Sequence, residues 1–134
     1  MNMRTALSAC VLVASLLAGC RVGGGYDEAA VAAGLGSQVR LELAEGEMRG
    51  ELLLARPDGI VLLQGARAFL APWAVIEKLS FSSYPVEDHK GGIAPSSVQR
   101  RQMQLASRYP HGLTDSQLAE LLAALDQAEL ERLQ

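Results

Sequence analysis

The 134-residue sequence has few of the residues on which many kinds of site depend. Cysteine occurs only as Cys10 and Cys20, and histidine only as His89 and His111. A metal site built from closely spaced cysteine and histidine ligands is therefore not expected. Aromatic residues make up 4% of the chain. A membrane-spanning helix needs about 20 apolar residues, and no uncharged run of the sequence is that long. The length allows one domain with appendages and argues against a two-domain enzyme.

The first twenty residues are typical of a bacterial secretory leader. The segment 1–5 contains one positive side chain, Arg4, and an uncharged run follows over 6–18. This run is too short to span a bilayer, but it matches a secretory apolar region of about 7–15 residues. The leader ends in small residues, with Leu-Ala-Gly-Cys at 17–20.

This tetrapeptide resembles the lipobox of bacterial lipoproteins. The resemblance implies cleavage between Gly19 and Cys20, and acylation of the thiol and the new amino group of Cys20. Two or three acyl chains anchor a protein stably, whereas one binds reversibly. Cys10 would leave with the leader, so the mature chain would have no free thiol. The alternatives are a signal peptide cut elsewhere, or an apolar helix of a cytoplasmic protein with two incidental thiols.

We predict a lipid-anchored protein of the bacterial cell envelope. Loss of 1–19 would leave 11 of the 12 basic residues and all 15 acidic ones, which gives a net charge of −4. Because nucleic acid is also negatively charged, it is not an expected partner. In families with this leader, Asp after the cysteine commonly retains the protein in the inner membrane. Arg21 stands there instead, which favours the outer membrane, facing the periplasm. Lipidated Cys20 and a flexible tether would occupy 20–26, and the six glycine-rich residues 21–26 give roughly 20 Å of reach.

The middle of the chain has the two-residue period of half-buried strands. Asp27 is a candidate cap for a short helix over 27–33, and turn sequences recur at 45–47, 57–59 and 64–66. Pro72 ends the fourth strand. The pattern predicts five short strands that form a small, strongly bent antiparallel barrel, at 38–44, 48–54, 60–63, 67–71 and 75–81.

Spaced glycines and apolar residues in this region resemble the Sm-like barrel, part of the SH3-like group. The matching positions are Gly36, Val39, Leu41, Leu43, Gly46, Gly50, Leu52, Pro72 and Ile76. The resemblance implies a five-stranded barrel over 27–81. Members of that family bind RNA as rings, but the turn at 44–47 has two glutamates and neither an aromatic residue nor Asn, and its carboxylates would repel phosphate. RNA binding is therefore not expected here.

The last third of the sequence predicts a linker and two helices. Residues 82–96 are rich in Ser, Gly and Pro and predict a linker with 87–90 exposed. The first helix would run from a cap at Ser96 or Ser97 to about 109, with Val98, Leu105 and Tyr109 along one stripe. A capping box at 114–117 opens the second helix. Its apolar stripe consists of Leu118, Leu121, Leu122 and Leu125, with Leu133 as an extension.

The predicted fold class is therefore mainly β with a C-terminal α part. A small five-stranded antiparallel Sm-like or SH3-like barrel would be followed by a helical hairpin over 97–134. The leucine stripe must be buried. It would dock on the barrel, whose ~55 residues are marginal alone, or pack against another chain.

Few residues suggest chemistry. His89 beside Asp88, and His111, lie far apart in glycine- or proline-rich segments typical of solvated loops. General acid–base catalysis needs paired groups on rigid elements, so we predict no enzyme, no catalytic residue, no cofactor and no metal. Arg100, Arg101 and Arg108 are the one basic concentration, which indicates either a phosphate or headgroup contact or a solvated helical face.

We predict a non-catalytic, membrane-anchored envelope lipoprotein that acts as a protein–protein interaction or assembly module. The partner would be another protein or a second copy. Trp73 fits either a plug of the barrel end or an exposed interface anchor. The candidate interface residues are Trp73, Leu118, Leu121, Leu122 and Leu125. The alternatives are an Sm-like nucleic-acid-binding protein, if the leader is not cleaved, and an accessory of an envelope hydrolase, which would need the two histidines together.

Overall fold

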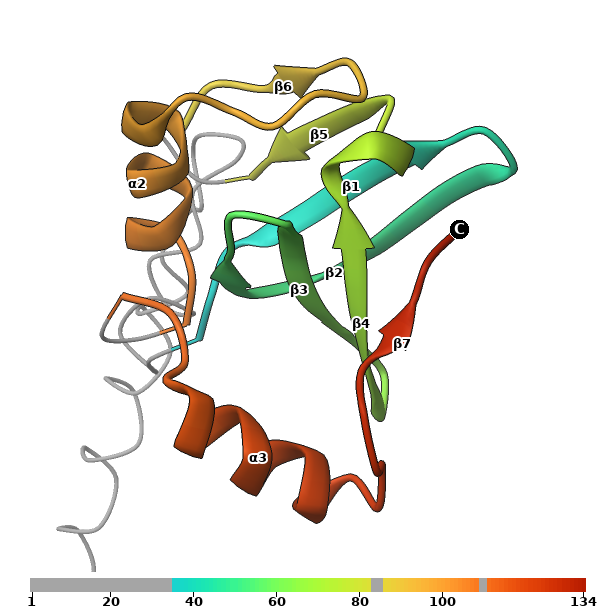
Figure 1. Cartoon of the computed structure of the whole chain (residues 1–134), viewed down its shortest axis with the longest axis vertical. Helices are drawn as coiled ribbons and strands as arrows, with labels where there is room; N and C mark the ends of the chain where they lie inside the picture. Colours follow the sequence, from blue (N-terminus) through green and yellow to red (C-terminus); the bar gives the residue numbers. More distant parts are fainter. Residues whose placement is uncertain (1–34, 83–85, 109–110) are drawn as a thin grey trace, which may run out of the picture.

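The described part of the chain folds around one seven-stranded sheet with helices beside it (Figure 1). The structure, a computed structural model, describes residues 35–82, 86–108 and 111–134. Its strands are β1 (Gln38–Leu43), β2 (Gly46–Ala55), β3 (Gly59–Gln64), β4 (Arg67–Pro72), β5 (Lys78–Phe81), β6 (His89–Lys90) and β7 (Glu131–Arg132). The helices are the 3-10 turn η1 (Trp73–Val75), α2 (Ser97–Leu105) and α3 (Asp115–Ala124).

The spatial order of the strands is β6-β5-β1-β2-β3-β4-β7. Neighbouring strands are antiparallel, except that β7 runs parallel to β4 through Phe69↔Glu131 and Leu70↔Arg132. The long strand β2 pairs with β1 along its first part and with β3 along its second. A register shift between Leu52 and Leu54 interrupts the second pairing, and such bulges bend a strand.

The predicted five-stranded antiparallel barrel is wrong. Strands occupy all five predicted segments, but the described residues form a seven-stranded mixed sheet that is not closed. One extra strand, β6, lies inside the predicted linker 82–96 and pairs with β5. The other, β7, comes from the C-terminal end of the chain and pairs with β4. Each has two residues, which is too short for the periodicity that identifies a strand.

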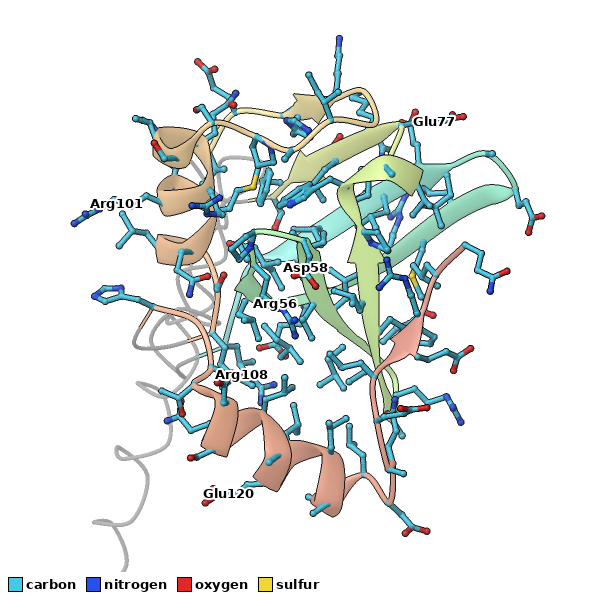
Figure 2. The ribbon with its side chains drawn as sticks, in the orientation of Figure 1. Arg56, Asp58, Glu77, Arg101, Arg108 and Glu120 are labelled. Atoms are coloured by element: carbon cyan, nitrogen blue, oxygen red, sulfur yellow. The ribbon has the colours of Figure 1, made fainter. Side chains whose placement is uncertain are left out.

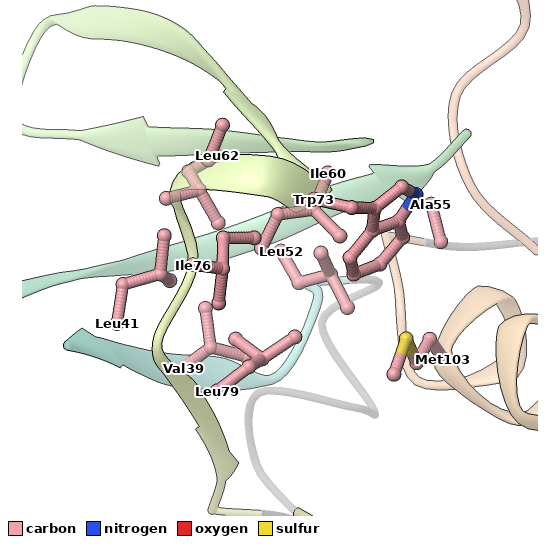
Figure 3. Packing of buried hydrophobic residues seen from close by; sticks show 11 residues of the cluster. Val39, Leu41, Leu52, Ala55, Ile60, Leu62, Trp73, Ile76, Leu79 and Met103 are labelled. Carbon is pink, nitrogen blue, oxygen red and sulfur yellow. The ribbon is translucent and has the colours of Figure 1, made fainter. Parts of the chain in front are cut away.

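The central strands bury both faces of the sheet. Alternate residues of β3 enter different clusters: Ile60 and Leu62 belong to the first, and Val61 to the second. In β2, the consecutive residues Leu53 and Leu54 both join the second cluster, because the register shift between Leu52 and Leu54 leaves Leu53 as the extra residue of the bulge. The first cluster consists of Val39, Leu41, Leu52, Ala55, Ile60, Leu62, Ala71, Trp73, Ile76, Leu79 and Met103 (Figure 3). The second consists of Leu53, Leu54, Val61, Ala68, Leu70 and Leu118.

The predicted helical hairpin is also wrong, because the two helices cover different faces of the sheet. The buried Met103 of α2 belongs to the first cluster, and the buried Leu118 of α3 to the second. Helix α2 ends at Leu105 rather than near 109. The capping box predicted at 114–117 is confirmed, since the Thr114 hydroxyl accepts from the Gln117 N–H and the Gln117 side chain accepts from the Thr114 N–H.

Candidate interaction surfaces

The leucine stripe of α3 docks on the chain's own sheet. Leu118 is buried, and the other three members of the stripe, Leu121, Leu122 and Leu125, pack half-buried against the same second cluster. The sequence left open whether the stripe packs within the same chain or against another chain. In the structure it packs against the sheet of the same chain. Leu133 does not extend the stripe: it follows β7 and packs against the first cluster.

Trp73 is a core residue and not an exposed anchor. Its side chain is 4% exposed, at the start of η1 (Figure 3). The indole Nε1–H donates to the carbonyl oxygens of Arg56 and Pro57, at 3.2 and 3.1 Å. These bonds attach the turn between β2 and β3 to the end of β4. Because the indole is covered, it is not available to a partner of the folded chain.

His89 is also buried, which corrects the predicted exposure of 87–90 at this one position, whereas Glu87, Asp88 and Lys90 are exposed as predicted. It pairs with Leu79 in the sheet and is 6% exposed. Its ring meets the Trp73 indole edge to face, with the two centroids 5.5 Å apart, and Nε2 lies 2.8 Å from the Ile93 carbonyl oxygen. His111 is exposed. The two histidines therefore occupy different environments.

An ion pair joins β2 to the chain just beyond α2. Arg108 donates from Nε and from a terminal guanidinium nitrogen to the two carboxylate oxygens of Glu51, at 2.7 and 2.6 Å. Gly36 N–H donates to the same carboxylate at 2.8 Å. Hydrogen bonding to Glu51 raises the pKa of Arg108 above its ordinary value, although burial opposes this rise. Arg108 is thus committed to Glu51 and does not belong to a free basic patch.

The remaining two arginines of that predicted patch differ in exposure. Arg100 is half-buried, whereas Arg101 is exposed and points away from α2 (Figure 2). A cluster of three free arginines is therefore not present on this face. Of these three arginines, Arg101 is the one that is exposed.

The outer face of α2 exposes apolar side chains that the sequence did not identify as a surface. Val98 and Leu105 are 67% and 57% exposed, and Ile93, shortly before the helix, is 73% exposed. The sequence placed Val98 and Leu105 on one stripe of this helix, but the residue that α2 buries is Met103. Singly exposed apolar residues are ordinary on protein surfaces, and on α2 they mark the side of the helix that the sheet does not cover.

A second exposed element is the β1–β2 hairpin, which projects on the side of the molecule away from α2 (Figure 1). Its tip at 44–47 is exposed. Arg49 Nε lies 2.9 Å from a Glu47 carboxylate oxygen, and Arg40 Nε lies 3.9 Å from the other. Exposed ion pairs of this kind contribute about 0–1 kcal/mol to stability, so these side chains can leave one another and bind another molecule at little cost.

The outer edge of β4 is covered by the C-terminal segment. The Gln127 side chain accepts from Ala68 N–H at 2.9 Å and donates to Ala68 O at 2.7 Å, as a paired strand residue would. Leu133 N–H donates to Leu70 O at 2.9 Å. An exposed strand edge is a template for pairing with another chain. This edge is therefore not free for strand addition at Ala68 and Leu70.

Gly19, Cys20 and the predicted helix at 27–33 lie outside the described residues. Within the described part, neither α-helix is long and apolar enough to cross a bilayer. The same residues contain no group of three or more His, Cys, Asp or Glu arranged to hold a metal ion. Comparison with protein-family models, curated proteins and solved structures finds no match to this chain.

Proposed function

We propose that the protein is a lipid-anchored, non-catalytic protein of the bacterial cell envelope that acts through protein–protein contact. The anchor would be Cys20, in the outer membrane and facing the periplasm. Support for the anchor is the Leu-Ala-Gly-Cys sequence at 17–20, preceded by an uncharged run and one arginine. Stable attachment follows from two or three acyl chains.

The observation that carries the proposal is how the N-terminal side of the domain is held. Gly36 N–H donates a hydrogen bond to Glu51, and Glu51 also binds Arg108, just beyond the C-terminal end of α2. A chain anchored through Cys20 therefore holds the domain by this end. The β1–β2 hairpin projects on the side of the molecule away from α2 (Figure 1). We assign the contact with a partner protein to this hairpin, because it projects away from the place where the N-terminal side of the domain is held.

Anchoring is tested by expressing the native chain and the Cys20→Ser variant, separating membranes, and measuring intact mass. The native protein should be membrane-bound, should lack residues 1–19, and should have acyl mass that the variant lacks. A soluble, full-length native chain would overturn the anchored assignment.

Contact through the hairpin is tested in cells by a photo-crosslinking residue at Glu45, with the same residue at exposed Ser116 of α3 as the control. We expect a discrete crosslinked product from position 45 that is lost with Cys20→Ser. Equal crosslinking from positions 45 and 116 would contradict a role for the hairpin.

A further inference from the structure

The outer edge of β2 is unpaired near the tip of the β1–β2 hairpin. Leu52 N–H donates to Ser37 O, so Leu52 and every second residue before it direct their backbone groups toward β1. Glu47 and Arg49 alternate with these residues and direct their backbone groups away from β1. The ladder with β3 begins only at Glu51, so Glu47 and Arg49 have no backbone partner on that side among the described residues. Such an edge is a template for pairing with another strand.

Within the hairpin, charged side chains stand opposite like charges. Arg40 of β1 is directly opposite Arg49 of β2, and Glu42 is directly opposite Glu47. Like charges that face each other across two strands are destabilising, whereas opposite charges are stabilising. Glu47 reaches the two arginines only along its own strand and across a diagonal, at 2.9 and 3.9 Å. One face of the hairpin therefore has a row of two arginines beside a row of two glutamates.

A second copy of the hairpin would place each row against its opposite charge. Antiparallel pairing of two β2 strands, about a twofold axis at Met48, puts Glu47 opposite Arg49 of the second copy and Arg49 opposite its Glu47. The arginine row of each copy then continues into the glutamate row of the other. The two neighbouring registers that keep the same backbone groups paired would instead oppose Glu47 to Glu47, or Arg49 to Arg49. Charge therefore selects one register.

The backbone and the other face of the hairpin fit the same register. Glu47 and Arg49 of the second copy would exchange both N–H···O bonds, which satisfies the unpaired edge. Met48 lies on the opposite face, where it is half-buried and packs against the first cluster. In this register Met48 meets Met48 of the second copy at a non-hydrogen-bonded position, where side chains come closest. The pairing would therefore bury apolar surface at its centre.

We infer that two copies of the protein pair through the outer edges of their β2 strands at 47–49, in antiparallel register about Met48. The inference rests on the proposed function for the place of contact, and it identifies the partner at the hairpin as a second copy. The edge at 47–49 is short, so the contact is weak between free molecules. Attachment of both copies to one membrane raises their effective concentration and favours the pairing.

The first measurement is disulfide trapping in cells that express the full chain. Opposed non-hydrogen-bonded residues have Cα atoms about 4.5 Å apart, within the range that a disulfide spans. We therefore expect Met48→Cys to form a covalent dimer on mild oxidation, above the background of the native chain with Cys10 and Cys20. Ala44→Cys, at the exposed tip of the same hairpin, is the matched control. Its two copies would lie roughly 25 Å apart along the strands, so it should form about tenfold less dimer.

The second measurement changes the charges of the pairing. Glu47→Arg and Arg49→Glu each place like charges across the inferred pair, so each should reduce the trapped Met48→Cys dimer about tenfold. Each change also relieves one like-charge pair inside the hairpin, with Glu42 or with Arg40, so both variants should fold. Co-expression of the two variants restores opposite charges on both sides of the axis, and should restore the dimer as a mixed species of two differently tagged chains.

Three results would overturn the inference. The first is equal trapping from Met48→Cys and Ala44→Cys. The second is a dimer that neither single charge change reduces, or that the two variants together do not restore. The third is a discrete crosslinked product from position 45 whose mass is not twice that of the chain, which would keep the hairpin contact and assign it to a different protein. Trapping is scored independently of the acyl mass of Cys20, so failure of this pairing and failure of the anchored assignment are distinguishable.

Discussion

Replacement of Glu51 by Gln would measure what the ion pair between β2 and the segment after α2 contributes to stability. The side chains of Glu51 and Arg108 are 9% and 23% exposed. Gln retains an amide oxygen that can accept from Gly36 N–H, but it removes the negative charge and one of the two acceptor oxygens that Arg108 uses. Loss of one partner from a buried pair costs about 3–5 kcal/mol. Because water reaches part of the guanidinium, we expect about 2–3 kcal/mol.

The assay is urea unfolding of the full chain, followed by the fluorescence of Trp73, the only tryptophan. Arg101→Gln, which removes an exposed charge from the same region, should change the unfolding free energy by less than about 0.5 kcal/mol. Adding Arg108→Met to Glu51→Gln should recover part of the loss, with a coupling energy of at least about 1 kcal/mol. A loss below about 0.5 kcal/mol for Glu51→Gln alone would refute the assignment of this pair as a stabilising junction.

The raised pKa of Arg108 adds a statement about pH. Hydrogen bonding to Glu51 raises this pKa in the folded state, so the associated stability is fully present below the unfolded value and is lost only as the pH rises through the folded one. Deprotonation of Arg108 is therefore not expected to weaken the junction near neutral pH, and urea unfolding in neutral and mildly alkaline buffers checks this.

Three further substitutions, one of them with a control variant, test other parts of the fold. Gln127→Leu removes the side-chain bonds to both backbone groups of Ala68, and should cost about 1–3 kcal/mol and speed hydrogen exchange of the Ala68 amide. Gly36→Ala should cost more than about 2 kcal/mol in urea unfolding, because its Cβ meets the Leu52 carbonyl, whereas Gly65→Asn, at an open turn with φ 58°, should cost under about 1 kcal/mol. Trp73→Phe keeps most of the packing but leaves the carbonyls of Arg56 and Pro57 without the indole donor, and should lower the thermal midpoint by an amount equivalent to about 1–2 kcal/mol.

Periodicity predicted where the five longer strands lie, but it could not predict how the sheet ends. The sequence at 60–63 is continuously apolar because β3 is buried on both faces, and the bulge in β2 places Leu53 and Leu54 in one cluster. The edges depend on long-range contacts. Gln127 and Leu133 attach the segment with β7 to β4, although they lie about sixty residues after that strand in the sequence. At Ala68 the partner is a side-chain amide instead of a strand backbone, and such a contact produces no periodicity in the sequence.

For the candidate site residues, too, the sequence pattern did not predict which distant parts of the chain contact one another. The spacing of the leucines in α3 correctly indicated burial but could not identify the surface that covers them. Gly and Pro around His89 indicated a loop, yet the histidine is buried through its pairing with Leu79 and its contact with Trp73. The exposed face of α2 was missed because Val98 and Leu105 have helical spacing whichever side of the helix packs on the sheet.

Helix α2 lies where the N-terminal side of the domain joins the sheet, which relates the fold to the proposed function. A helix of nine residues is too short to be stable on its own, so its packing decides its position, and Met103 alone supplies the buried contact with the first cluster. The N-terminal side of the domain joins the sheet here, close to the Glu51–Arg108 pair. In the anchored protein that we propose, the polar β1–β2 hairpin would be the free end of the domain, and a partner would meet its charged side chains first.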